Sequence, residues 1–270
     1  MLYKTIALSL SFITLSAFTH HLPATDATIR DLTKETAIAH VDNGKSDEDA
    51  EEAMMLKMDG LFTNLYHQLA DHGKMPQYPV FKKALLGYYN LLAQGKVENK
   101  DILTIIDFSL PSSEKRLWIV DLDNKAVLYH DLVAHGRSTG NVNAENFSDT
   151  PNSHMSSLGF YVTGETYYGK HGFSLRLEGM EAGFNKNAFA RAIVVHGADY
   201  VSQDFIKRNG RLGRSYGCPA VSRDISDRVI NAIKNKSCMF IYASAVDYEV
   251  NSNLLNVQTA LEYLTSKSFI

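Results

Sequence analysis

The stretch ILTIIDFSLPSSEKRLWIVDLDNKAVLYHDLVAHG, residues 102–136, decides the expected fold of this chain. β-branched and aromatic residues come in short runs, and Asp123-Asn124 lies between two of them as in a hairpin turn. The same rhythm returns in LGFYVTGETY (158–167), SLRLEG (174–179), RAIVVHG (191–197) and CMFIYA (238–243). Short strands separated by turns predict a mainly β domain over residues 100–245, built as a sandwich or a barrel-like sheet.

Helical patterns flank this region, so the class over the whole chain is α+β. Residues 46–99 predict a small helical unit that lies against the β domain, with Ser46 as the first N-cap and Gly73 and Gly95 as helix ends. A further amphipathic helix is predicted over SRDISDRVINAIKN (222–235). Residues 246–270 receive no assignment and are treated as a C-terminal tail.

The N-terminus, MLYKTIALSLSFITLSAFTHHLPATDA, predicts a secretory signal peptide over residues 1–19. A weakly positive start precedes an apolar segment that is too short to favour a membrane span. The alternative is an anchor that is not cleaved. Polar residues 20–45 predict a flexible linker. We therefore expect an exported protein that contacts a membrane only through its signal.

Composition excludes several classes of function. The 270 residues carry a net charge of −3 without a basic block, which argues against a nucleic-acid partner. The two cysteines, Cys218 and Cys238, fit neither a disulfide-rich scaffold nor a structural zinc site. The histidines show no short ligand spacing, so no metal is expected. The oligomeric state is not predicted.

Cys218 and His196 are the one pair in the sequence that suggests covalent catalysis. A cysteine attacks as the thiolate, and an unperturbed thiol needs a base to provide it at neutral pH. His196 ends the strand RAIVV, which offers a rigid support for that base. Gly217 permits a positive φ and close approach of a substrate. The backbone N–H groups of Gly217 and Cys218 are predicted to face a developing oxyanion.

Several motifs resemble a known family. A strand that ends in His-Gly, followed by a loop and Ser-X-Gly-Cys, resembles the signature of the YkuD-type L,D-transpeptidases. Longer segments are similar to the branch called the murein L,D-transpeptidase catalytic domain family: IIDFSLPSSEKRLWIVDL (105–122), LVAHGRSTG (132–140), NSHMSSLGFYVTGETYYGKHGFSLRLEGMEAGFN (152–185), RAIVVHGADYVSQDF (191–205) and GRLGRSYGCPAV (210–221). The resemblance covers about residues 100–243, and this breadth makes it more specific than the His/Cys pair alone.

The resemblance implies cofactor-free acyl transfer on peptidoglycan stem peptides in the periplasm or cell wall. Cys218 attacks the carbonyl between meso-diaminopimelate and the terminal D-Ala of a tetrapeptide. D-Ala leaves, and an amine of another stem resolves the thioester into a 3→3 cross-link. His196 is the base, and Gly197 orients it through its backbone carbonyl. The loop that shapes the oxyanion pocket consists of Ser215, Tyr216 and Gly217.

The sequence departs from the commoner YkuD pattern, Ser-His-Gly-Cys followed by one residue and then Arg or Asn. Tyr216 replaces the second histidine, and Ala220 stands where the Arg or Asn would be. Arg214 is the candidate that binds a donor carboxylate instead, because a guanidinium suits a carboxylate bidentately. His154 and His171 border the expected cleft and are candidate substrate contacts, with polar loop positions as the alternative.

Other interpretations stay open. With water as acceptor the same site is an L,D-carboxypeptidase or an L,D-endopeptidase, and a catalytically dead wall-binding module is the third hypothesis. A Cys218–Cys238 disulfide is the alternative to a free nucleophile, although Cys238 lies in an apolar strand typical of a core. His135 is interpreted as structural. Asp199 either orients His196 or makes a local turn contact.

Overall fold

The computed structural model describes residues 42–270, with side chains from residue 48. The chain divides into two units, residues 1–50 and residues 51–270. Only residues 42–50 of the first unit are described, so the predicted signal peptide and most of the predicted linker lie outside the described residues. The second unit takes in the predicted helical unit from residue 51, the predicted catalytic domain and the predicted tail. Within residues 42–270 no helix has both the length and the apolar character that a membrane span requires.

One nine-stranded sheet forms the centre of the second unit, in the order β3-β2-β1-β9-β5-β6-β7-β8-β4. The strands are β1 (Ile102–Asp107), β2 (Leu117–Asp121), β3 (Ala126–Asp131), β4 (Val133–Ala134), β5 (Gly159–Gly169), β6 (Gly172–Gly179), β7 (Val194–Ala198), β8 (Ala220–Ser222) and β9 (Cys238–Tyr242). The strands at the two ends of this order, β3 and β4, are consecutive in the chain, and only Leu132 separates them. The sheet therefore curls until its ends meet, which is the barrel-like form of the predicted β architecture.

The predicted hairpin turn is present between β2 and β3, where Asp121 pairs with Ala126. Asp121 Oδ1 accepts the backbone N–H groups of Asp123 and Asn124 at 3.0 and 2.9 Å. Lys125 takes a positive φ of 55° and completes the turn. A side-chain oxygen that satisfies turn amides explains why this Asp-x-Asp-Asn sequence reverses the chain.

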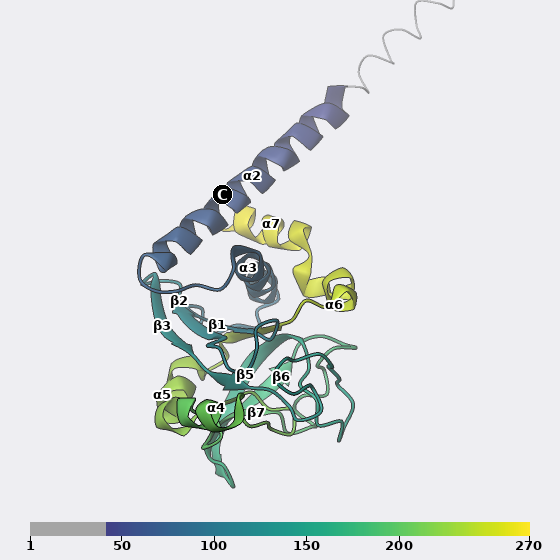
Figure 1. Ribbon diagram of the computed structural model, residues 1–270. Coiled ribbons are helices and arrows are strands. Elements are labelled where there is room, and N and C mark those ends of the chain that lie inside the picture. The colour runs from purple at the N-terminus through teal and green to yellow at the C-terminus, as the bar shows by residue number, and fades with distance from the viewer. Residues whose placement is uncertain (1–41) are drawn as a thin grey trace, which may run out of the picture. The chain divides into compact units, whose positions relative to one another are not determined.

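Strands β1 and β9 pair in parallel in the interior of the sheet, with Ile105 opposite Phe240. Every residue of both strands is buried. Helix α3 (Tyr78–Ala93) contacts both strands, and helix α5 (Arg223–Ile233) contacts β1 from another side of the sheet (Figure 1). Helices on both faces explain why these two strands are continuous apolar runs rather than alternating ones.

The two predicted upstream helices are present as α2 (Asp42–Ala70) and α3. The predicted N-cap Ser46 lies inside α2, because the helix already begins at Asp42. Helix α3 has its proline in the first turn, where the missing N–H costs nothing. A Cβ at Gly87 would lie 2.0 Å from Phe160 Cζ, so this glycine lets α3 approach β5 closely.

Residues 246–270, predicted as a C-terminal tail, contain α6 (Val246–Asn251), a 3₁₀ turn (Asn253–Leu255) and α7 (Val257–Ser266). Buried Asn90 of α3 donates from Nδ2 to Leu254 O at 2.8 Å and to Asn256 O at 2.9 Å. Tyr248 donates its hydroxyl to buried Glu181 at 2.9 Å. These contacts hold the segment predicted as a tail against the core.

Two further elements, one before the cysteine motif and one after it, escape the sequence prediction. Helix α4 (Gln203–Asn209) begins at Ser202, whose Oγ accepts the Phe205 N–H at 3.2 Å, and ends at Gly210 with φ 71°. Strand β8 follows Cys218 and inserts between β7 and β4. Both elements are short, and short elements leave little periodicity in a sequence.

Candidate active site

Cys218 lies in the loop that leads into β8, and Ser215 shapes this loop. Ser215 Oγ donates to Cys218 O at 2.7 Å and accepts the Gly217 N–H at 3.0 Å. Gly217 has φ 122°, and a Cβ there would lie 2.7 Å from Met155 O. Only glycine fits this conformation and this space. The loop is a closed turn that leaves the cysteine half-buried at its end.

The predicted oxyanion role of the Gly217 N–H requires a correction. This N–H group is directed into the turn, because Ser215 Oγ, two residues earlier, accepts it at 3.0 Å. The N–H of Cys218 lies near its own sulfur and lowers the pKa of the thiol. It is therefore the remaining predicted donor for an oxyanion.

His196 is the middle residue of β7 and only 3% exposed. Its Nδ1–H donates to Gly197 O at 3.1 Å, since a carbonyl oxygen can only accept. Nε2 therefore carries the lone pair and is the nitrogen able to take a proton. The ring of His171, from the β5–β6 turn, stacks on His196 with centroids 4.4 Å apart and planes at 24°.

Strand pairing brings His196 and Cys218 to one place. His196 is directly opposite Ala220 in the parallel β7–β8 pair, and Cys218 precedes Ala220 by two positions. Residues two apart in extended chain share a face. Both side chains line one pocket of about 400 Å³. The thiol of Cys218 donates to Ala192 O at 3.8 Å, so the S–H group must leave this carbonyl before His196 can take its proton.

Burial sets the charge state of this pair. It raises the pKa of the Cys218 thiol, while the Val194 N–H and the Arg191 guanidinium act in the opposite direction. Burial lowers the pKa of His196, and the neighbouring His171 lowers it further. The hydrogen bond to the Gly197 carbonyl acts in the opposite direction and raises it. Both shifts favour neutral groups, so the resting site holds a thiol and an imidazole rather than an ion pair.

The pocket wall is cationic. Lys170, Arg191 and Arg214 line it, and none of the described residues that line it is acidic. Arg191 is fully engaged with the protein, since it donates to Ser148 O at 2.8 Å and to Met155 O at 2.6 Å, besides other contacts. The Arg191 side chain therefore has a structural role in the pocket wall.

The other two cations differ in their freedom. Arg214 Nη1 donates to Gly140 O at 3.0 Å and to Arg137 O at 3.4 Å. Within the described part of the chain, the amine of Lys170 makes no hydrogen bond or ion pair with the protein. Sequence analysis singled out Arg214 and missed Lys170, although Lys170 directly precedes His171. Tyr167 and Tyr200 complete the aromatic part of the wall.

A buried Arg116–His135 pair lies behind the cysteine loop. Arg116 Nη2 donates to His135 Nδ1 at 2.8 Å, and both residues are fully buried. Burial and the guanidinium lower the pKa of His135 to about 4, which keeps it neutral. The backbone carbonyl of His135 accepts the Ser215 N–H at 3.0 Å. His135 is thus structural, as the sequence predicts, and its position supports the catalytic loop.

The remaining predicted residues fall at the rim or elsewhere. Tyr216 lines the pocket at its rim and is 61% exposed. The ring of His154 packs on Tyr216, with ring centroids 4.7 Å apart, and His154 does not line the pocket. His154 Nδ1 accepts from Arg137 Nη2 at 2.9 Å. Asp199 pairs with Arg223, with Oδ1 2.5 Å from Nε, and the two residues are 24 positions apart in the chain. This ion pair is neither the predicted turn contact nor a contact with His196.

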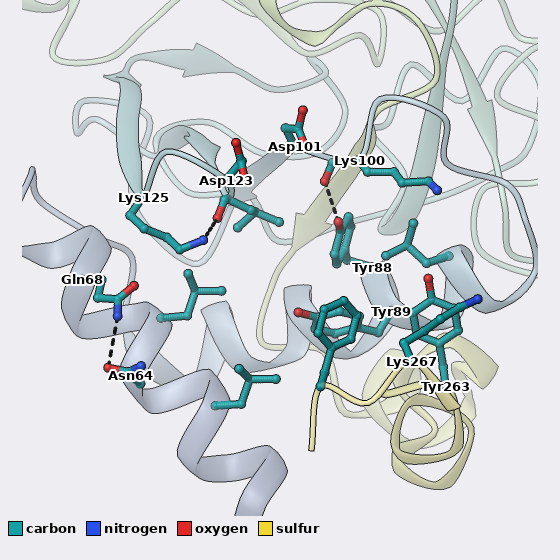
Figure 2. A pocket seen from close by; sticks show the side chains of 15 residues that line it. Asn64, Gln68, Tyr88, Tyr89, Lys100, Asp101, Asp123, Lys125, Tyr263 and Lys267 are labelled. Atoms are coloured by element: carbon teal, nitrogen blue, oxygen red, sulfur yellow. Dashed lines mark hydrogen bonds between the residues drawn. The ribbon is translucent and has the colours of Figure 1, made fainter. Parts of the chain in front are cut away.

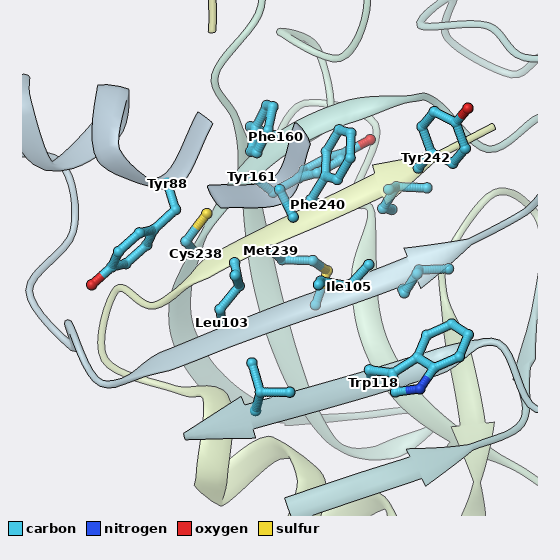
Figure 3. Close-up of a cluster of buried hydrophobic side chains, with 14 of the residues drawn as sticks. Tyr88, Leu103, Ile105, Trp118, Phe160, Tyr161, Cys238, Met239, Phe240 and Tyr242 are labelled. Atoms are coloured by element: carbon cyan, nitrogen blue, oxygen red, sulfur yellow. The ribbon is translucent and has the colours of Figure 1, made fainter. Parts of the chain in front are cut away.

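Cys238 belongs to the core and not to the site. It is fully buried in β9, and Figure 3 shows it beside Tyr88 and Leu103. Both cysteines are free, so the alternative of a disulfide between them is wrong. Burial raises the pKa of the Cys238 thiol far above its ordinary value, which leaves it unreactive. Among residues 42–270 no cluster of three His, Cys, Asp or Glu side chains is arranged to hold a metal ion.

The family model described as the L,D-transpeptidase catalytic domain matches residues 72–242. Similar solved structures are an L,D-transpeptidase from Mycobacterium smegmatis and LdtMt1 in complex with imipenem, each 12% identical with a TM-score of 0.34 over 53% of this chain. An L,D-transpeptidase from Mycobacterium tuberculosis H37Rv is 12% identical with a TM-score of 0.32.

The chain spans 59% of the length of each of the first two structures and 57% of the third. No curated protein matches it. The family model alone covers more than half of the chain and includes both His196 and Cys218. The chain therefore belongs to the L,D-transpeptidase catalytic domain family.

Proposed function

We propose that this protein is a peptidoglycan L,D-transpeptidase with Cys218 as the nucleophile and His196 as the base. The observation that carries the proposal is the pocket of about 400 Å³ that Cys218 and the Nε2-basic His196 both line, beneath a cationic wall. A tetrapeptide stem is anionic near its scissile bond, since the terminal D-Ala and the diaminopimelate both carry carboxylates. A wall of lysine and arginine suits such a substrate.

In the proposed acylation, His196 Nε2 removes the thiol proton while the sulfur attacks the carbonyl of diaminopimelate. The S–C bond forms and the carbonyl electrons move to oxygen, where the Cys218 N–H donates to the oxyanion. The intermediate collapses, the C–N bond to D-Ala breaks, and the imidazolium returns the proton to the leaving amine. Because the resting pair is neutral, proton transfer accompanies attack instead of preceding it.

The thioester is then resolved by an amine of a second stem. That amine attacks the thioester carbonyl and loses its proton to His196, and the C–S bond breaks. The proton returns to sulfur, and a 3→3 cross-link is released. Water in place of the amine gives hydrolysis with the same residues, so product mass separates transfer from hydrolysis. The predicted signal peptide supports the further proposal that this chemistry takes place outside the inner membrane.

Lys170 is proposed to hold a donor carboxylate, in place of the Arg214 predicted from sequence. Its amine is free of protein partners within the described residues, whereas Arg214 is tied to the carbonyls of Gly140 and Arg137. A charge-assisted hydrogen bond contributes about 1.5–3 kcal/mol. Lys170→Ala should therefore raise KM at least about tenfold with a smaller change in kcat. Lys186→Ala, an exposed lysine outside the pocket, is the control.

The test is release of D-Ala from a purified tetrapeptide, followed by mass spectrometry with and without an added amine acceptor. Cys218→Ala should be inactive, whereas Cys238→Ala should keep activity if folded. His196→Ala should lower kcat by roughly 10²–10⁴-fold. A carbapenem, as an acylating probe, should leave its adduct on Cys218. D-Ala release by the Cys218→Ala protein would overturn the proposal.

A further inference from the structure

A second pocket lies away from the catalytic one and shares none of its lining residues. Its volume is about 690 Å³, within the range of about 300–1,000 Å³ that is usual for small-ligand sites. Side chains of α2, α3, the β2–β3 turn and the C-terminal segment surround it (Figure 2). The proposed chemistry uses none of these residues.

Aromatic rings from different elements line this pocket. Tyr89 comes from α3, Tyr263 from α7, and Phe269 from the segment after α7. Their centroids lie 6.3 Å (Tyr263) and 6.5 Å (Phe269) from that of Tyr89. Tyr89 stacks on Phe62 with centroids 5.7 Å apart and planes at 6°, so its ring is held from one side. Phe269 is 57% exposed, which leaves apolar ring surface open to a ligand.

The phenol of Tyr89 is a neutral hydrogen-bonding group. Burial raises the pKa of Tyr89 to about 12, and the nearby Tyr263 adds to the shift. A neutral phenol both donates and accepts. The ring of Tyr89 therefore combines an apolar face with a polar edge.

The rest of the pocket wall is polar and of mixed charge. Asn64 and Gln68 of α2 offer side-chain amides, and Gln68 Nε2 donates to Asn64 Oδ1 at 3.3 Å. Asp101 and Asp123 are exposed, and within the described residues their carboxylates have no hydrogen-bond or ion-pair partner. The amine of Lys100 is likewise free in that part of the chain.

This combination selects a class of ligand. The wall carries the carboxylates of Asp101 and Asp123 and the amines of Lys100, Lys125 and Lys267, so its mixed charges favour an uncharged polar ligand over an ionic one. A purely apolar ligand would leave the amides and carboxylates without partners. A pyranose ring has a face of C–H groups and an edge of hydroxyls, which suit aromatic faces and planar amides or carboxylates. The acetamido group of an amino sugar adds an amide for Asn64 and a methyl for the leucines of the wall, Leu61 and Leu92.

We propose that this pocket, named here the aromatic pocket, binds the N-acetylated amino-sugar chain of the substrate polymer. The choice of that polymer rests on the proposed transpeptidase function. A glycan held here raises the local concentration of the stem peptides attached to it. The catalytic pocket then needs to bind only the end of one stem.

The test measures binding of the full chain to the β-1,4-linked tetramer of N-acetylglucosamine and to glycan strands stripped of stem peptides, by calorimetry. Wild-type protein should bind both. Phe269→Ala should weaken binding about tenfold, which corresponds to about 1.4 kcal/mol. Asp123→Asn removes one acceptor at an exposed turn and should weaken binding without affecting folding. Phe189→Ala is the matched control, because Phe189 is 55% exposed and lies outside this pocket.

Equal binding by wild type, Phe269→Ala and Asp123→Asn would overturn the proposal, as would no binding of either glycan by wild type. Release of D-Ala from a sugar-free tetrapeptide tests the proposed function separately. Glycan binding that depends on Phe269, without D-Ala release, supports the aromatic pocket and contradicts the transpeptidase. D-Ala release without glycan binding supports the transpeptidase and contradicts the proposal for the aromatic pocket.

Discussion

Replacing Ser215 with alanine removes the hydroxyl that shapes the cysteine loop. This one oxygen donates to Cys218 O at 2.7 Å and accepts the Gly217 N–H at 3.0 Å, and Ser215 is only 6% exposed. Two neutral hydrogen bonds of about 1 kcal/mol each give an expected loss of about 2 kcal/mol in the free energy of unfolding. Because both bonds fix the nucleophile, we expect a similar loss in transition-state stabilisation. That loss corresponds to about a 30-fold decrease in kcat/KM for D-Ala release.

The assay pairs urea unfolding with D-Ala release below the unfolding midpoint. Ser237→Ala is the matched control, because Ser237 is fully buried and donates from Oγ to Ile233 O at 2.6 Å, away from the pocket. It should lose comparable stability and keep its kcat/KM. Ser215→Thr retains the hydroxyl and should recover part of the activity. The reasoning is refuted if Ser215→Ala keeps full kcat/KM, or if Ser237→Ala loses as much activity as Ser215→Ala.

Three further predictions concern titratable groups. Iodoacetamide should modify only Cys218 in the folded protein and should reach Cys238 only after denaturation. Mass spectrometry of the peptides measures both, and labelling of Cys238 in the folded protein would contradict this prediction. The acid limb of kcat/KM should have its midpoint below pH 6.5, since burial and His171 lower the pKa of His196 and catalysis needs the neutral imidazole. His171→Ala should move that midpoint to higher pH, and an unchanged profile would exclude an effect of His171. His135 binds fewer protons folded than unfolded between its folded pKa of about 4 and its ordinary 6.5. The free energy of unfolding should thus fall by about 3 kcal/mol as pH falls through this window. Urea titrations of wild type and His135→Gln at several pH values measure this fall, and a wild-type free energy of unfolding that stays constant over the window would contradict the prediction.

The sequence alone determined the features that depend on local periodicity and on motif chemistry. Apolar runs with turns predict most of the strands, and the Asp121–Asn124 turn follows from side-chain groups within four residues. The family resemblance also pointed to Cys218 and His196 as the pair to examine. These signals are local, or repeat over a long stretch of chain, so a sequence retains them.

Only the tertiary structure decided which groups meet across long separations in the chain. Lys170 reaches the pocket because the β5–β6 turn folds beside β7, and Arg191 supports the cysteine loop through carbonyls far away in sequence. The N–H of Gly217 is engaged by Ser215 Oγ in the folded loop, a contact that the identity of the two residues permits but does not specify. The aromatic pocket combines residues 61 and 269, which share no pattern. Burial sets the neutral state of His196 and Cys218, and burial is a property of the packed chain rather than of either residue.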